Sequence, residues 1–136
     1  QGEHRVCVAA AERPSGLRDT IPVGSQLTMR AGSAAQVLLA WEDPERMHRG
    51  LQNAAFSAAA LSGIRRRGWA QSIGEREQGV ASVSAPVRSP GGKIIAAVSV
   101  SGPLERLSRQ PGRMHAPAVL AAAERLSESL RRAAAE

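Results

Sequence analysis

The alternation of apolar and polar positions is clearest in residues 80–87 (VASVSAPV) and 94–101 (IIAAVSVS). A period of two is typical of β-strands, whose successive side chains point to opposite faces. In both segments one face is wholly apolar. The other face carries short hydroxyl side chains, namely Ser82, Ser84, Ser99 and Ser101. The connecting RSPGGK is rich in turn residues, so the two segments predict a β-hairpin.

The length of the turn sets the pairing of this hairpin. If Ser89-Pro90-Gly91-Gly92 form the loop, Ser82 lies opposite Ser99 and Ser84 lies opposite Ala97. This register places the four serines on one side of two neighbouring strands.

Helical periodicity and capping residues predict most of the remaining elements. The predicted elements are strands at 4–10 and 69–73, a helix from Ser33 as N-cap to Trp41, a short helix after Asp43-Pro44-Glu45, a helix at 53–67 ended by Gly68, and a helix at 116–135 with the seam Val119, Ala123, Leu126 and Leu130. This order predicts an α+β domain with an antiparallel sheet, helices packed on one face and a small-molecule pocket on the other.

Size and composition fit one domain. The 136 residues are 43% hydrophobic and 22% charged, and no long uncharged apolar run indicates a membrane segment. Cys7 is the only cysteine, which favours a reducing cytoplasm. Because the chain starts at Gln1 without a Met or a signal pattern, we expect residues 1–136 to be a single domain truncated at its N-terminus.

The net charge of +6 raises the possibility of nucleic acid binding. Apart from Arg65-Arg66-Arg67, however, the arginines are scattered among acids, and aromatic residues for base stacking are few. We therefore expect no specific DNA contact by this chain itself.

The sequence gives little support for catalysis or for metal binding. Ser33 is not in a Gly-x-Ser-x-Gly elbow, and the three histidines lack both acidic partners and the spacing of metal ligands. We therefore expect that the protein is not an enzyme and that it binds no metal or other cofactor.

The serine face allows two interpretations. It is either a solvated face of a one-sided sheet or the floor of a cavity. Four short hydroxyls beside Ala97 leave a depression where long polar side chains usually stand, which favours a cavity for a small polar ligand.

Two segments carry a family resemblance. GIRRRGWAQSIGEREQGVASVSAPVRSPGGKIIAAVSVSGPLERL and LTMRAGSAAQVLLAW resemble, in order and spacing, the effector-binding domain of IclR-type bacterial transcription regulators. The resemblance implies a GAF-like fold, a small-molecule effector, homodimers or homotetramers, and DNA binding only through an N-terminal winged helix-turn-helix that this chain lacks.

The resemblance also implies the pocket residues. Matched positions are Ser99 and Ser101 for paired hydroxyls, Ser33 and Ala34 for the helix entry, Leu17 and Leu27 for apolar walls, and Ser72 and Ser82 where some members have Asp and Cys. Gln36 and Arg30 stand where Lys and His are usual in the family.

A helix N-terminus at Ser33 favours an anion because its first amides lack partners within the helix. We therefore expect a carboxylate-bearing metabolite to bind there and to alter operator binding by the intact protein. The alternative is a GAF-like dimerisation or interaction domain without a small ligand.

Overall fold

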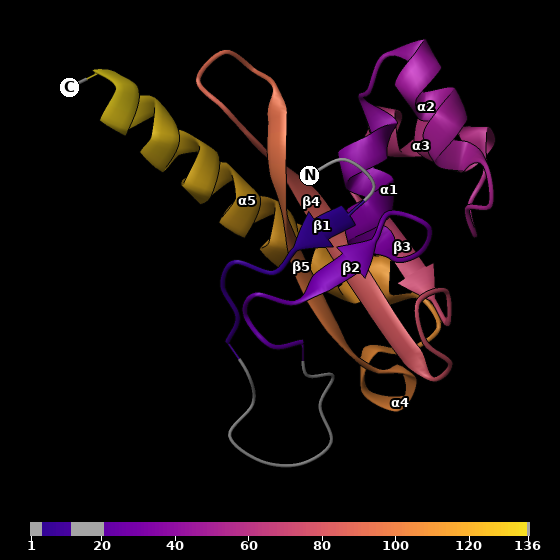
Figure 1. The fold of residues 1–136 in the computed structure, drawn as a ribbon. Helices are drawn as coiled ribbons and strands as arrows, with labels where there is room; N and C mark the ends of the chain where they lie inside the picture. Colours follow the sequence, from indigo (N-terminus) through magenta and orange to yellow (C-terminus); the bar gives the residue numbers. More distant parts are fainter. Residues whose placement is uncertain (1–3, 12–20, 136) are drawn as a thin grey trace.

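The computed structural model of the protein describes residues 4–11 and 21–135 (Figure 1). Its elements in chain order are β1 (His4–Val6), β2 (Gln26–Thr28), α1 (Ser33–Ala40), α2 (Pro44–Leu51), α3 (Ala58–Arg67), β3 (Ala70–Ile73), β4 (Val80–Arg88), β5 (Ile94–Pro103), α4 (Leu104–Leu107) and α5 (Pro111–Ala135). The predicted α+β class with antiparallel strands is confirmed.

The main sheet has the order β3-β4-β5, and β1 pairs with β2 in a separate two-stranded sheet. Figure 1 shows α5 on one side of β4 and β5, with α1 on the other side. A helix therefore also lies on the face where the sequence predicted a pocket. The serine face is covered as well, because the short side chains let α1 come close to the sheet.

The hairpin pairing also differs from the prediction. Ser82 lies opposite Ser101 and Ser84 opposite Ser99, two residues away from the expected partners. The hairpin closes with Ser89 N–H donating to Lys93 O, and a β-bulge between Val87 and Arg88 adds a further residue to β5. Because the shift is even from Val80 to Val87, the side chains of this part of the hairpin keep their predicted faces.

The apolar face of the sheet packs on α5. Its buried cluster consists of Val83, Ala85, Val87, Ala116, Val119 and Ala123. At the start of α5, a Cβ on Gly112 would lie 2.3 Å from the Trp69 ring, so only glycine allows this approach of helix and strand. The helix begins at Pro111 rather than at 116, and it contains Pro117.

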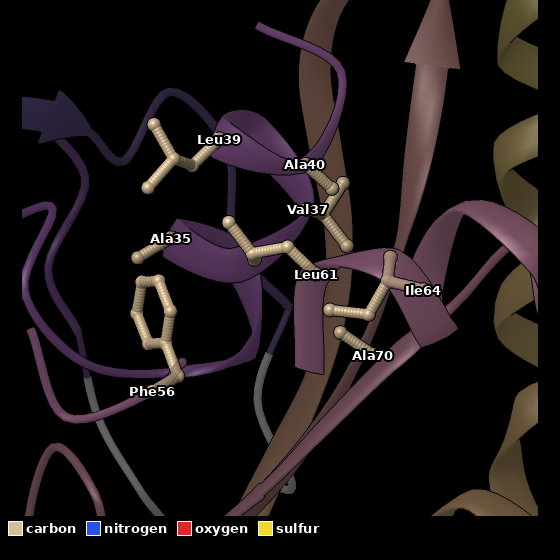
Figure 2. Packing of buried hydrophobic residues seen from close by; sticks show 8 residues of the cluster. All are labelled: Ala35, Val37, Leu39, Ala40, Phe56, Leu61, Ile64 and Ala70. Atoms are coloured by element: carbon tan, nitrogen blue, oxygen red, sulfur yellow. The ribbon is translucent and has the colours of Figure 1, made fainter. Parts of the chain in front are cut away.

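The opposite side is held by a second cluster between α1, α3 and β3 (Figure 2). Its members are Ala35, Val37, Leu39, Ala40, Phe56, Leu61, Ile64 and Ala70. Phe56 belongs to this core although the helix predicted from 53 starts only at Ala58, where the Ser57 hydroxyl accepts from Ala60 N–H. The predicted caps Asp43 and Gly68 are confirmed.

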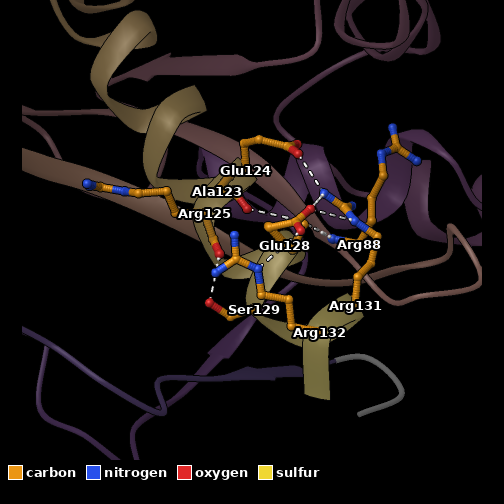
Figure 3. A network of polar contacts seen from close by, with 9 residues as sticks. Arg88, Ala123, Glu124, Arg125, Glu128, Ser129, Arg131 and Arg132 are labelled. Atoms are coloured by element: carbon orange, nitrogen blue, oxygen red, sulfur yellow. Dashed lines mark hydrogen bonds and ion pairs between the residues drawn. The ribbon is translucent and has the colours of Figure 1, made fainter. Parts of the chain in front are cut away.

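The predicted seam of α5 divides into two parts. Val119 and Ala123 are buried on the sheet, whereas Leu126 is 50% and Leu130 37% exposed. The Ser127 hydroxyl marks the limit of contact, since it accepts from Arg88 N–H and donates to Ala123 O. Beyond it, Arg131 pairs with Glu124 and Glu128 near the end of the helix (Figure 3).

Among the described residues, no helix combines the length and the apolar character needed to cross a bilayer.

Candidate functional site

The start of α1 is the centre of the candidate site. Gly32, with a φ of 101°, is the residue that caps the helix, and no side chain makes a capping hydrogen bond there. The prediction of Ser33 as a capping hydroxyl is therefore wrong. Its side chain instead lies beneath the helix and contacts the serine face of the sheet.

Five serine hydroxyls form one continuous hydrogen-bonded chain, here named the serine chain. In order its members are Ser72, Ser82, Ser33, Ser84 and Ser99. The Oγ–Oγ distances are 2.7 Å for Ser72–Ser82, 2.7 Å for Ser82–Ser33, 2.6 Å for Ser33–Ser84 and 2.5 Å for Ser84–Ser99. Ser33 joins both halves and so attaches α1 to β4 by two hydrogen bonds.

Burial differs along the serine chain. Ser33 and Ser84 are 1% and 0% exposed, and Ser72 and Ser82 are also buried. Ser99, on the edge strand β5, is exposed and Ser101 is half-buried. The serine face is thus neither fully solvated nor an open cavity floor. Helix α1 closes most of it, and the Ser99 end remains accessible.

Glu75, in the turn between β3 and β4, ties this turn to α1. Its Oε1 accepts from Gly32 N–H at 3.1 Å, and both carboxylate oxygens accept from the buried Gln36 side chain at 3.0 and 2.9 Å. A carboxylate beside a helix N-terminus is electrostatically favourable. The amides of Ser33, Ala34 and Ala35 have no acceptor among the described residues, as expected for a first helical turn.

A small cavity of about 230 Å³ lies beside this helix start. Its lining consists of Arg5, Gln26, Leu27, Thr28, Ala31 and Arg76. A Cβ on Gly32 would lie 3.1 Å from Arg5 Nη2 and 3.9 Å from Arg76 Cβ, which places both arginines next to the cap of α1. Burial and, to a smaller extent, the charge of Arg76 lower the pKa of Arg5 below its ordinary value.

Most of the predicted site residues lie around this helix start. Ser33, Ser72, Ser82 and Ser99 belong to the serine chain, and Ser101 lies opposite Ser82. Ala34 is half-buried in the first turn of α1. Leu27 lines the small cavity. Leu17 lies outside the described residues.

Sequence reasoning missed Glu75 and the two cavity arginines. It placed Ser84 on the serine face by alternation but did not include it among the pocket residues. The turn GEREQG has the polar composition of an ordinary surface connection. Nothing in its composition indicates that Glu75 contacts one side of the helix start while Arg76 lines the cavity.

A larger cavity of about 670 Å³ lies between α1, α3 and the end of β3. Arg66 and Arg67 line it, and the Arg67 guanidinium lies 4.1 Å from the centre of the Trp69 ring. These arginines belong to the last turn of α3, where their positive charge is favourable beside the helix C-terminus.

No cluster of three or more His, Cys, Asp or Glu side chains suited to a metal occurs in the part of the chain that the structure describes.

Comparison with known proteins gives consistent results. Residues 1–128 match the family model described as bacterial transcriptional regulator IclR C-terminal. The HTH-type transcriptional regulator BhcR of Paracoccus denitrificans is 30% identical over 139 aligned positions, which cover 93% of this chain and 50% of BhcR. The glycerol operon regulatory protein of Streptomyces griseus is 30% identical over 106 positions, covering 70% of this chain and 42% of that protein.

The fold is similar to that of a solved transcriptional regulator from Rhodococcus sp. RHA1. The TM-score is 0.87 at 25% identity, and the match covers 97% of this chain and 58% of the other. The chain spans about half the length of the curated relatives it matches.

Proposed function

The chain belongs to the IclR family of bacterial transcriptional regulators, whose C-terminal domain it matches, and on this premise we propose that it is the ligand-sensing domain of a DNA-binding regulator. The family is one of regulators and not of enzymes, as the sequence predicted. We propose residues 1–136 as one effector-binding domain in a cytoplasmic protein that contacts its operator through a separate helix-turn-helix domain. The ligand is a small carboxylate-bearing metabolite.

The observation that carries this proposal is the small cavity with Arg5 and Arg76 beside the N-terminus of α1. Two guanidinium groups and the partial positive charge of a helix start converge on one place. A bound carboxylate would lower the electrostatic cost that burial and Arg76 impose on Arg5. The volume of about 230 Å³ is below that of pockets for drug-sized ligands, roughly 300–1,000 Å³, and favours a small acid.

The exposed end of the serine chain supports the same ligand class. Ser99 is only two hydrogen bonds away from Ser33 at the helix start. A carboxylate held near the arginines accepts from this hydroxyl.

Signalling requires that the ligand bind one arrangement of the domain better than another, since equal affinity shifts no equilibrium. Three separate segments meet at the cavity: β1, β2 and the turn that carries Glu75 and Arg76. A ligand that contacts all three stabilises one arrangement of them, which is the difference that the DNA-binding domain would sense.

Isothermal titration calorimetry with a panel of small aliphatic and aromatic acids tests this proposal. At least one acid should bind, and Arg5→Gln should weaken that binding at least tenfold. The matched control is Arg49→Gln, since Arg49 pairs with Glu45 on the exposed surface of α2. Binding of only neutral or cationic compounds, or equal losses in both variants, would contradict the proposal.

The exposed half of α5 favours a second role in assembly. Leu126 and Leu130 extend the apolar seam beyond the sheet, which is suited to contact between copies of the chain. We propose a homodimer or homotetramer on this basis. Sedimentation should show a smaller species for Leu126→Lys combined with Leu130→Lys. If association is lost while acid binding persists, the two roles are separate; if no acid binds, a pure interaction domain becomes the better account.

A further inference from the structure

The serine chain contains one more hydroxyl proton than the hydrogen bonds within it require. Five hydroxyls carry five protons, and four hydrogen bonds join them. Each bond takes its proton from one of its two oxygens, so exactly one hydroxyl donates outside the chain. The other four hydroxyls each donate to the next serine in the direction of the one whose proton points out of the chain. The location of the surplus proton therefore fixes the direction of every bond.

Burial decides where the surplus proton lies. Ser33 and Ser84 each have two hydroxyl partners and no other side-chain hydrogen bond. Ser72 is buried, and its hydroxyl has Ser82 as its one partner among the described residues. A proton directed away from any of these oxygens would be a buried donor without an acceptor, which costs more than a hydrogen bond contributes. Only Ser99 is exposed.

We propose that the serine chain is polarised, with Ser72 donating to Ser82, Ser82 to Ser33, Ser33 to Ser84 and Ser84 to Ser99, so that the Ser99 proton points outward. Neighbouring hydrogen bonds that run in one direction strengthen one another. Ser99 is thereby set as a hydrogen-bond donor before any ligand arrives. The buried serines are positioning residues, because they act on a ligand only through Ser99.

This inference rests on the proposed function and adds a rule of selectivity to it. A donor fixed in advance favours ligands that accept a hydrogen bond at this point, such as a carboxylate or a keto oxygen. A ligand that presents only a donor to Ser99 meets an oxygen that already accepts from Ser84, and it cannot accept the outward Ser99 proton. Reversal of the chain would free the Ser99 oxygen but leave the Ser72 proton buried without an acceptor. Such ligands therefore bind more weakly.

Neutron diffraction from crystals of the protein grown in D2O tests the polarity directly and needs no ligand. The expected deuterons lie on Ser72, Ser82, Ser33 and Ser84 within the four hydrogen bonds, with the Ser99 deuteron directed away from Ser84. A Ser99 deuteron between Ser99 and Ser84 would overturn the proposal, and so would a Ser72 deuteron directed away from Ser82.

A variant at the buried end provides the second test. Ser72→Asp places an acceptor without a proton there, so Ser82 should donate to it and the chain should reverse, with the Ser99 deuteron turned toward Ser84. Ser72→Asn has nearly the same shape without the charge and is the matched control. If the aspartate variant does not fold, Ser84→Ala replaces it: this cut should leave the Ser99 deuteron in several orientations. An unchanged Ser99 orientation in the variant that is used would overturn the proposal.

Benzoate binding measured by calorimetry connects the polarity to the ligand. Ser72→Asp should bind benzoate at least tenfold more weakly than Ser72→Asn, and equal affinities would overturn the selectivity rule. If no carboxylate binds the wild-type protein while the deuterons lie as expected, the proposed function fails and the polarity remains. If carboxylates bind while the Ser99 deuteron points toward Ser84, the polarity fails and the proposed function remains.

Discussion

The two faces of the central sheet differ in the kind of interaction that holds a helix against them. On one face, Val83, Ala85 and Val87 pack on α5 by apolar contact, and the hydrogen bond from Arg88 N–H to the Ser127 hydroxyl lies at the margin of this contact. On the other, Ser82 and Ser84 hold α1 through hydrogen bonds to Ser33. Apolar contact is non-directional and stabilises according to the area buried. Hydroxyl contacts contribute less to stability, but they fix position and direction.

Within one hairpin, the face that packs on α5 contributes mainly to stability, whereas the face that contacts α1 carries the candidate ligand site. Adjacent residues of the same strand, such as Val83 and Ser84, belong to different faces and are both completely buried. Substitutions on the face that packs on α5, here named the α5 face, should therefore leave the candidate site intact. The face that contacts α1, here named the α1 face, carries the candidate site and contributes a smaller part of the stability of the fold.

The largest loss of stability is expected for a substitution at Gly112, on the α5 face. Gly112→Ala would place a Cβ 2.3 Å from the Trp69 ring and 2.8 Å from Gln71 Oε1. Separating the helix from β3 should lower the free energy of unfolding by about 3 kcal/mol in a urea titration. Gly63→Ala is the control, because its Cβ would meet only the Arg66 and Arg67 side chains beyond 3.5 Å. A cost in Gly63→Ala as large as that in Gly112→Ala would contradict this account of the α5 contact.

A substitution at Val83 should change stability but not ligand affinity, which compares the two faces directly. Val83→Ala removes two buried methyl groups from the α5 face and should lower the free energy of unfolding by about 2 kcal/mol. Ligand affinity should stay within twofold of wild type, because Val83 does not face the candidate site. A large loss of acid binding in this variant would show that the faces are not independent.

Ser84→Ala should have the reverse pattern. It removes two hydroxyl contacts from the α1 face and leaves one buried hydroxyl proton without an acceptor, so it should cost about 1–2 kcal/mol of stability. Binding of the acid identified by calorimetry should nevertheless fall several-fold, since Ser99 loses the neighbour that orients it. If Ser84→Ala destabilises the protein more than Val83→Ala, the contrast between the faces is wrong.

The smallest effect is expected where α5 leaves the sheet. Hydrogen bonding from Arg131, and then its charge, lower the pKa of Glu128 (Figure 3). A carboxylate with a lowered pKa stabilises the folded state above its unfolded pKa and loses this contribution as pH falls through the folded value. Both side chains are solvent-exposed, so Arg131→Gln should leave the thermal midpoint at pH 7 nearly unchanged. A clear drop at pH 7 that disappears at pH 3 would indicate that this end of α5 is buried in an assembly.

The sequence predicts the α1 face less well than the α5 face, and particular residues explain why. Period-two alternation assigns Val83 and Ser84 to opposite faces whatever the register, so the composition of both faces was predictable. The bulge between Val87 and Arg88 was not, because no residue signal distinguishes a turn closed at Ser89 and Lys93 from the expected four-residue loop.

What covers the serine face depends on contacts far apart in the chain. Serines of an exposed face and serines beneath a helix have the same alternation, and the hydrogen bond from Ser33 to Ser84 joins residues 51 positions apart. The local signal at Gly32-Ser33 correctly gave a helix start, but the choice of Gly32 as cap depends on its positive φ. For Arg5 and Arg76, spacing along the chain gives no indication that they line one cavity.

Crystals of the protein grown with the carboxylic acid that calorimetry ranks first provide the most direct test of the central claim, that the α1 face is the sensing face. The predicted result is density for one acid, with its carboxylate toward Arg5 and the amides at the start of α1, and with Ser99 donating to it. Density in the larger cavity between α1 and α3 instead, or no density while the acid binds in solution, would contradict the claim.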